Sequence, residues 1–158
     1  MKNRKTPMAF GWIINLLRKH KIQFQIAGGL AARAYGARRE LADIDIDIDT
    51  KDFKRLNKLL VGHIVYGHTR YRDHNWNAIL MTARYENQLI DLVDKQSVKI
   101  FDHDTKRWIP YHSHFSTSVR KKIFDLIVPV ENRNDLVWNK RALQRRVDRK
   151  DLATMKLR

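Results

Sequence analysis

Apolar and polar positions along the first 35 residues follow two different spacings. A helix is indicated by four apolar side chains that share one helical face, at Phe10, Ile13, Ile14 and Leu17. Thr6-Pro7 has the form of an N-cap followed by proline at the first helical position, so the helix is expected to begin there. Residues 22–27 (IQFQIA) alternate apolar and polar side chains and predict a half-buried strand. The alanine-rich residues 30–35 predict a short helix that starts at Gly28-Gly29.

The remaining pattern predicts a mixed sheet flanked by helices, which is an α+β fold. Thr50 can cap a helix that runs to Leu60. Two closing helices are expected, one over residues 132–143 and one from Asp148 onward. Strands are expected over residues 42–48, 61–67, 76–83, 88–93 and 123–130. With no internal repeat or linker, residues 1–158 are expected to form a single domain.

Residues 43–49, DIDIDID, carry the sharpest alternation. Successive side chains on a strand point to opposite faces, so three isoleucines are expected to face the core and four aspartates to face away together. Aspartate is depleted in strands, and like charges at this spacing repel. A bound divalent cation would relieve the repulsion, and carboxylate oxygens suit magnesium between a protein and substrate phosphates. The alternative is an exposed edge strand with incidental aspartates.

A calcium-binding helix–loop–helix is excluded by spacing. Its loop needs glycine at the sixth position and glutamate at the twelfth. Starting from Asp43 these positions hold Ile48 and Lys54, and starting from Asp45 they hold Thr50 and Leu56.

Gly28-Gly29 lies at a predicted strand-to-helix junction. Glycines let the backbone approach a phosphate, and a helix start offers free amide groups, although a Gly-Gly pair alone is often only a turn. Together with the aspartates, the segment IAGGLAARAYGARRELADIDIDI (residues 26–48) resembles the signature of the polymerase-beta-like nucleotidyltransferase superfamily. It is similar in particular to the small bacterial branch with the lincosamide and aminoglycoside nucleotidyltransferases and the minimal nucleotidyltransferases. The thirteen residues between Gly29 and Asp43 fall within the family's spacing, which makes Asp43 and Asp45 the matched pair.

The resemblance implies a magnesium-dependent enzyme that transfers a nucleoside monophosphate from ATP or another nucleoside triphosphate to a hydroxyl acceptor. Asp43 and Asp45 would be catalytic metal ligands, and two magnesium ions would clamp the attacking and leaving oxygens. Asp91, within Ile90-Asp91-Leu92, is the best match to the third carboxylate, with Asp94 and Asp73 as competitors. It would complete the metal site or accept the proton of the acceptor hydroxyl. The residues implied to bind the nucleotide are Gly28, Gly29, Arg39 and Lys140; for Lys140 a solvated basic helix is the alternative.

The composition adds a preference for polyanions. A net charge of +15 and a pI near 10.3 favour nucleic acid or nucleotide phosphates as partners. An RNA end is therefore one expected acceptor, next to a small molecule or a protein side chain. Candidate RNA contacts are the basic clusters at residues 18–21, 120–122 and 145–146.

Other functions are less well supported by the sequence. His112-x-His114 could bind a metal but lacks a third ligand. A catalytically weak member of the fold, acting in a toxin–antitoxin pair or as a basic nucleic-acid-binding protein, is the alternative to an enzyme. A homodimer is expected as one way to complete the acceptor side. The absence of cysteine and of a long apolar segment predicts a cytoplasmic protein with no membrane association.

Overall fold

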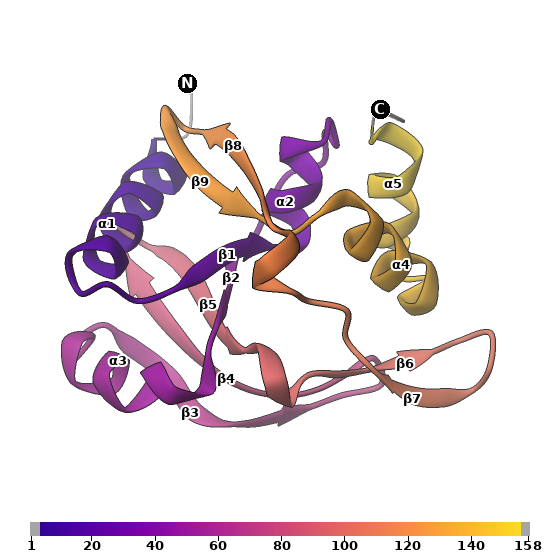
Figure 1. The fold of residues 1–158 in the computed structure, drawn as a ribbon, viewed down its shortest axis with the longest axis horizontal. Helices are drawn as coiled ribbons and strands as arrows, with labels where there is room; N and C mark the ends of the chain where they lie inside the picture. Colours follow the sequence, from indigo (N-terminus) through magenta and orange to yellow (C-terminus); the bar gives the residue numbers. More distant parts are fainter. Residues whose placement is uncertain (1–3, 156–158) are drawn as a thin grey trace.

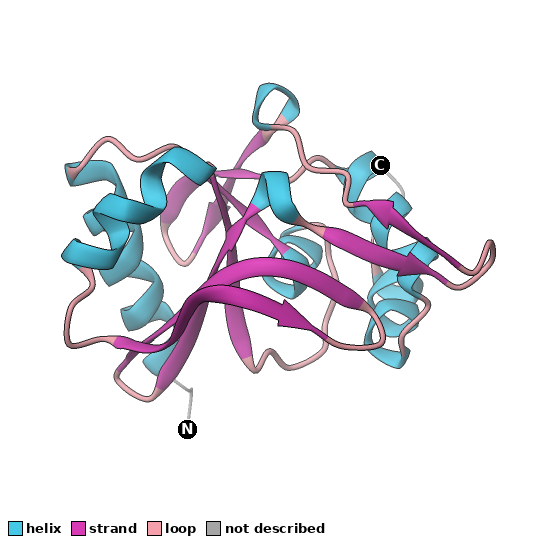
Figure 2. Ribbon diagram, turned by 90° about the horizontal axis from the view of Figure 1, so that it is seen from below, coloured by secondary structure: helices cyan, strands magenta, loops and turns pink. Residues whose placement is uncertain are grey.

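The computed structural model describes residues 4–155, in which nine strands form one mixed sheet with helices packed around it (Figures 1 and 2). The predicted α+β class is confirmed. The elements in chain order are α1 (Lys5–Lys19), β1 (Phe24–Ala27), α2 (Gly28–Ala34), β2 (Asp43–Ile48), α3 (Phe53–Leu59), β3 (Ile64–Arg72), β4 (Trp76–Tyr85), β5 (Gln88–Asp94), β6 (Lys99–Asp102), β7 (Arg107–Pro110), β8 (Val119–Ile123), β9 (Leu126–Val130), α4 (Arg133–Leu143) and α5 (Arg146–Thr154).

The sheet order places the predicted aspartate strand near the centre. The strands follow the order β7-β6-β4-β5-β2-β1-β9-β8, and β3 pairs with β4 outside this path. β2 is antiparallel to β1 and parallel to β5. The parallel pairing matters for function, because it sets one strand's carboxylates directly beside those of the next.

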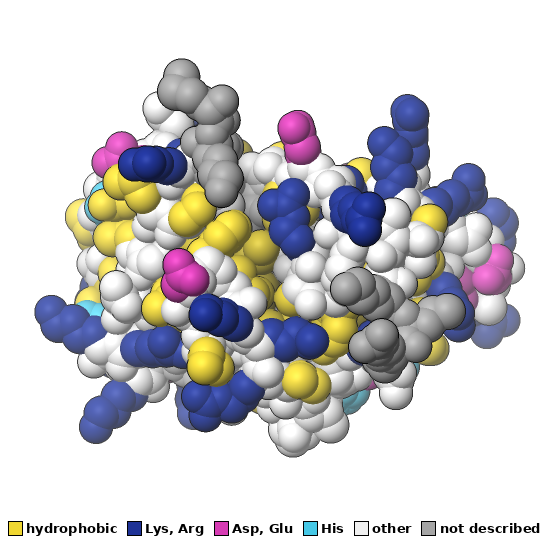
Figure 3. All heavy atoms as spheres, turned by 90° about the horizontal axis from the view of Figure 1, so that it is seen from above, with side chains coloured by type: hydrophobic (Ala, Val, Ile, Leu, Met, Phe, Trp, Pro, Cys, Tyr) yellow, Lys and Arg dark blue, Asp and Glu magenta, His cyan; other side chains and the backbone are white. Residues whose placement is uncertain are grey.

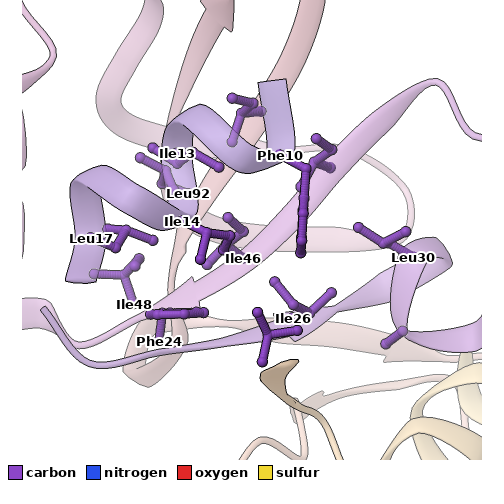
Figure 4. Packing of buried hydrophobic residues seen from close by; sticks show 14 of the residues in the cluster. Phe10, Ile13, Ile14, Leu17, Phe24, Ile26, Leu30, Ile46, Ile48 and Leu92 are labelled. Atoms are coloured by element: carbon purple, nitrogen blue, oxygen red, sulfur yellow. The ribbon is translucent and has the colours of Figure 1, made fainter. Parts of the chain in front are cut away.

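One face of this sheet packs against α1. Ile44, Ile46 and Ile48 are fully buried, as the alternation predicted. Figure 4 shows the apolar face of α1 directed at Ile46, Ile48 and Leu92, with Phe24 and Ile26 of β1 beside them. The isoleucines of β2 therefore anchor the strand in the core and leave its aspartates on the opposite face.

The opposite face is covered mainly at one end. A second apolar cluster joins β4 and β6 to α4, through Ala78, Val98, Ile100, Ala142 and Leu143. In Figure 1, α1 and α3 lie on one side of the molecule and α4 and α5 on the other. This arrangement leaves an open cleft over β2, β4 and β5.

Several element boundaries differ from the predictions. α1 begins at Lys5, and Thr6 does not cap it; its hydroxyl donates instead to Oε1 of Gln88 at 2.6 Å. The strand predicted over residues 61–67 is β3, which runs from Ile64 to Arg72. The single strand predicted over residues 123–130 is a hairpin, because Phe124 and Asp125 adopt positive φ angles of 45° and 67° and turn the chain between β8 and β9.

Tertiary pairing explains the elements that the pattern did not predict. β6 and β7 form a hairpin after Asp94 that joins the sheet through only two residue pairs, Trp76 with Ile100 and Asn77 with Lys99. The final helix begins at Arg146, two residues before the predicted start.

Candidate active site

The strand register brings three carboxylates together. Asp45 lies opposite Asp91 in the parallel pairing of β2 and β5, and Asp43 precedes Asp45 on the same face. One carboxylate oxygen from each of Asp43, Asp45 and Asp91 lies within 4.8 Å of the others. No other set of three His, Cys, Asp or Glu side chains within residues 4–155 meets this criterion. Three oxygen donors at this separation fit a hard divalent cation such as magnesium.

Asp94 and Asp73, the competitors of Asp91, do not belong to this cluster of carboxylates. Asp94 is buried and accepts a hydrogen bond from Thr50 Oγ1 at 2.6 Å. Asp73 lines the cleft, but it accepts from the backbone amides of Asn75 and Trp76, which fix a turn. Asp91 is thus the aspartate that joins the predicted pair.

Gly28 and Gly29 border the carboxylates where glycine is required. Gly28 has φ +60°, and a Cβ atom there would clash with Oδ2 of Asp45. A Cβ atom on Gly29 would lie 2.5 Å from Nη2 of Arg39. The turn from β1 into α2 therefore packs directly against an aspartate and an arginine, and the positive φ angle makes Gly28 the position that tolerates a larger residue least.

These residues line a cleft of about 570 Å³. The glycine turn and Arg39 line the cleft together with the three carboxylates. Tyr66 and Tyr71 of the outer strand β3 also line the cleft, and they are 40% and 39% exposed. Further lining residues are Trp76, Thr82, Tyr111, Lys140 and Arg145.

Burial raises the pKa values of all three carboxyls, and repulsion between carboxylates adds to the shift for Asp45 and Asp91. For Asp45, burial raises the pKa well above its usual value, and the charges of Asp43 and Asp91 raise it further. For Asp91, burial raises the pKa to about 6, although the hydroxyl of Thr82 opposes the shift by donating to Oδ1 at 2.6 Å. For Asp43, burial again raises the pKa, and the charge of Arg39 lowers it. A cluster that holds protons this firmly in the absence of a cation is one that a cation would stabilise.

The predicted row of four aspartates is not exposed as one set, although Asp43, Asp45 and Asp47 all line the cleft. Asp47 is buried; its Oδ2 accepts from Ser113 Oγ at 2.6 Å and from Gln25 Nε2 at 3.0 Å. Asp49 lies beyond the end of β2 and accepts from the backbone amide of Lys51 at 3.1 Å. The prediction that all four face outward as one set is therefore wrong, because a connecting loop covers Asp47 and the strand ends before Asp49.

Lys140 is buried, with its side chain 4% exposed. Its ammonium lies 2.9 Å from Oδ2 of Asp151 and 3.4 Å from Oδ1 of Asp148. The alternative of a solvated basic helix is wrong for this residue, and its predicted contact with phosphate stays a prediction.

Arg145 is the cleft residue whose position the sequence did not reveal. It belonged to a basic pair expected on the surface, yet its guanidinium lies over the Trp76 ring at 5.2 Å and donates to Asp148 from Nε at 2.8 Å and from Nη2 at 3.0 Å. The pairing with Asp148, three residues further along the chain, is a local signal, whereas its position over the Trp76 ring depends on a residue distant in sequence.

Tyr111 and Glu131 also escaped the sequence analysis. The Tyr111 hydroxyl donates to the fully buried Glu131 at 3.0 Å, and Asn139 donates to the other carboxylate oxygen at 3.0 Å. Burial raises the pKa of Glu131 well above its usual value, and the charge of Asp47 adds to the shift. Tyr111 and Asn139 line the cleft, so this network fixes part of its wall beside Trp76.

His112 and His114 both face Asp135. Nδ1 of His114 lies 3.0 Å from Oδ2, and Nδ1 of His112 lies 3.9 Å from Oδ1. His112 also stacks on Trp138 at 3.5 Å between ring centroids. The pair thus has a carboxylate neighbour, but the three side chains do not converge on a common metal position.

The fold of the described residues is shared with solved structures of nucleotidyltransferases. The sequence matches no protein-family model and no curated protein, whereas several solved structures share the fold. One is a protein from Thermotoga maritima provisionally assigned as a nucleotidyltransferase, with a TM-score of 0.73, 13% identity, and coverage of 97% of this chain and 92% of that one.

Two further solved structures are antibiotic-modifying proteins. ANT(2'')-Ia, in complex with adenylyl-2''-tobramycin, gives a TM-score of 0.55 and 13% identity over 85% of this chain and 73% of that one. The lincosamide antibiotic adenylyltransferase LnuA, with lincomycin bound, gives a TM-score of 0.53 and 16% identity over 91% of this chain and 92% of that one. At these identities the likeness establishes the fold. Within the described residues, none of the helices has the length and apolar content needed to cross a lipid bilayer.

Proposed function

We propose that this protein is a magnesium-dependent nucleotidyltransferase, which transfers a nucleoside monophosphate from a nucleoside triphosphate to a hydroxyl acceptor. The observation that carries the proposal is the convergence of Asp43, Asp45 and Asp91 beside the Gly28-Gly29 turn. ANT(2'')-Ia with its adenylylated antibiotic and the adenylyltransferase LnuA give the fold a precedent for this chemistry.

In this proposal the three carboxylates hold magnesium, and the glycine turn and Arg39 receive the triphosphate. Magnesium, when bound, would neutralise charge on the phosphate oxygens during the displacement. The glycines contribute by their size, because a Cβ atom at residue 28 would clash with Asp45 and one at residue 29 would crowd Arg39. Lys140 is a further candidate for the triphosphate side of the cleft.

The reaction makes one bond and breaks one. The acceptor oxygen bonds to the α-phosphorus, and the bond from that phosphorus to the bridging oxygen breaks, so that pyrophosphate leaves. The proton of the acceptor hydroxyl needs a base nearby. Asp91 is our candidate for this base as the alternative to metal binding, because burial raises its pKa to about 6 in the metal-free protein and makes the carboxylate more basic than usual.

For the acceptor we propose an RNA end. The net charge of +15 attracts polyanions and repels polycationic small molecules. Figure 3 shows Lys and Arg side chains spread over the upper face of the molecule, with few Asp or Glu among them. Tyr66 and Tyr71, exposed beside the carboxylates, offer faces on which bases could stack.

The test is a transfer assay with two labels. Purified protein is incubated with magnesium, an RNA pool and nucleoside triphosphates labelled at either the α- or the γ-phosphate. The proposal predicts that RNA gains label only from the α-position. Label gained only from the γ-position would mean phosphoryl transfer, and no transfer to RNA, to small hydroxyl compounds or to protein would remove the support for an enzyme.

A further inference from the structure

Three buried charges tie the last two helices together next to the cleft. Lys140 of α4 lies between Asp148 and Asp151 of α5, and both aspartates are fully buried. Charges this deep are expensive to leave unpaired. Lys140 therefore cannot turn toward a ligand without leaving two buried carboxylates without their shared cation.

Each of the two aspartates also accepts hydrogen bonds from an arginine. Asp148 accepts two hydrogen bonds from the guanidinium of Arg145, and Asp151 accepts one from Nε of Arg39 at 2.8 Å. Both arginine side chains are partly exposed, 31% for Arg145 and 21% for Arg39, and both line the cleft that contains the carboxylates. They thus reach the cleft from two different segments, one after α4 and one before β2.

The chemistry of the two cation types separates their roles. A guanidinium has five N–H donors in a fixed plane, so an arginine can bind a carboxylate with some and a phosphate with the others. Arg145 uses Nε and Nη2 for Asp148, which leaves Nη1 available. The ammonium of Lys140 is compact and enclosed between two aspartates.

We propose that Arg145, together with Arg39, binds the phosphates of the nucleotide, and that Lys140 is a positioning residue that acts through Asp148 and Asp151. The inference rests on the proposed function and refines it, because it assigns phosphate binding to two arginines in place of Lys140. The ligand it specifies is a polyphosphate at the side of the cleft bounded by Gly29 and Trp76.

The first test uses inorganic tripolyphosphate with magnesium, a probe that carries neither base nor acceptor. Isothermal titration compares the wild type, Arg145→Gln and the control Arg141→Gln, which removes the same charge from an exposed residue of α4. Loss of a charge-assisted hydrogen bond predicts that affinity falls about tenfold or more in Arg145→Gln. The control should bind nearly as the wild type does. Equal losses in the two variants would reduce Arg145 to a nonspecific charge and overturn the assignment.

The second test uses a variant, Asp148→Asn, for which the positioning role and simple charge attraction predict opposite changes in affinity. Asp148→Asn removes a negative charge beside a polyanion site, so Coulomb's law alone predicts tighter binding of tripolyphosphate. If Asp148 instead holds Arg145 in place, binding should weaken several-fold, and adding Arg145→Gln should cause little further loss. Tighter or unchanged binding in Asp148→Asn would overturn the positioning role of this network. Circular dichroism and thermal melting verify that each variant folds.

The outcomes separate this inference from the proposed function. If the wild type binds no tripolyphosphate with magnesium, the polyphosphate site and this inference both fail. If the wild type binds and Arg145→Gln binds equally well, the site stands and only the assignment of Arg145 fails. Lys140→Met, where it folds, should resemble Asp148→Asn; an additive loss when it is combined with Arg145→Gln would instead mark Lys140 as a direct ligand.

Discussion

At the scale of single residues, Gly28 has the least freedom to change. Its φ of +60° is strained for other residues, and a Cβ atom would push against Asp45 Oδ2. We expect Gly28→Ala to destabilise the fold by about 1 kcal/mol or more and to weaken magnesium-dependent nucleotide binding at least tenfold. Thermal melting and nucleotide titration measure the two effects.

Gly11 provides the matched control for this substitution. It lies inside α1, and a Cβ atom there would meet nothing within 4 Å. Gly11→Ala should stabilise the helix by about 0.5–1 kcal/mol and leave nucleotide binding unchanged. A similar loss of binding in both variants would contradict the role given to Gly28.

The raised pKa of Asp91 predicts how pH affects metal binding. Its pKa is about 6 in the metal-free protein, so the carboxyl is largely ionised above pH 7 and largely protonated below pH 5. Magnesium requires the ionised form and competes with the proton. Magnesium affinity, measured by calorimetry, should therefore fall as pH falls from 7.5 to 5.5, with protons released on binding. An affinity that stays constant over this range would contradict the interpretation.

The raised pKa of Asp91 also predicts that, without metal, the folded protein becomes less stable as the pH rises and this carboxyl ionises. A carboxyl whose pKa is raised by folding contributes stability below its unfolded pKa and loses that contribution as pH rises through its folded pKa. Removing the charge should thus raise the melting temperature of metal-free protein at pH 8, so Asp91→Asn should melt a few degrees higher. Asp125→Asn, at a position with a 99% exposed side chain, should melt as the wild type does. The melting temperature of Asp91→Asn should drop relative to wild type once magnesium is added.

At the scale of elements, the sequence predicted best where one local pattern coincided with one buried face. The alternation of residues 43–48 identified both β2 and its buried isoleucines, and the Gly-Gly pair marked the start of α2. The sequence predicted poorly those elements that form by pairing with segments distant along the chain. β6 and β7, which the pattern did not predict, form a hairpin that joins the sheet by pairing with β4.

The residues of the candidate site also fall into two groups, those that the sequence predicted and those that it did not. Asp43, Asp45, Gly28 and Gly29 are close in sequence, and Asp91 follows from its position between apolar residues in β5. Arg145 could not be placed from the sequence, because its position depends on how α4 and α5 pack together, as Figure 1 shows for the end of the chain.

The packing of β2 against α1 gives a test at this scale. Ile46 is fully buried between them, so Ile46→Ala should reduce the free energy of unfolding by about 2–5 kcal/mol. Ile127→Ala, at a position that is 51% exposed, should change it far less. Chemical denaturation of both variants measures the difference. Comparable losses would contradict the packing of α1 on β2.

At the scale of the whole molecule, net charge governs the choice of partner. With +15 charges, the protein should bind single-stranded RNA without strong sequence preference, and the affinity should fall steeply with salt. Fluorescence anisotropy between 50 and 200 mM salt should show at least a tenfold loss, in line with the release of several counterions. Absence of binding at the lower salt concentration would argue against an RNA acceptor, while the nucleotide site would be unaffected.

The central claim is that Asp43 and Asp45 hold magnesium for a nucleoside triphosphate, and the most direct measurement is a titration with each triphosphate, with and without magnesium. The wild type is compared with Asp43→Asn/Asp45→Asn, which keeps the shape of the site and removes its charge. The account predicts triphosphate binding that requires magnesium in the wild type and is lost in the variant. Binding that is equal in both proteins, or that ignores magnesium, would contradict it.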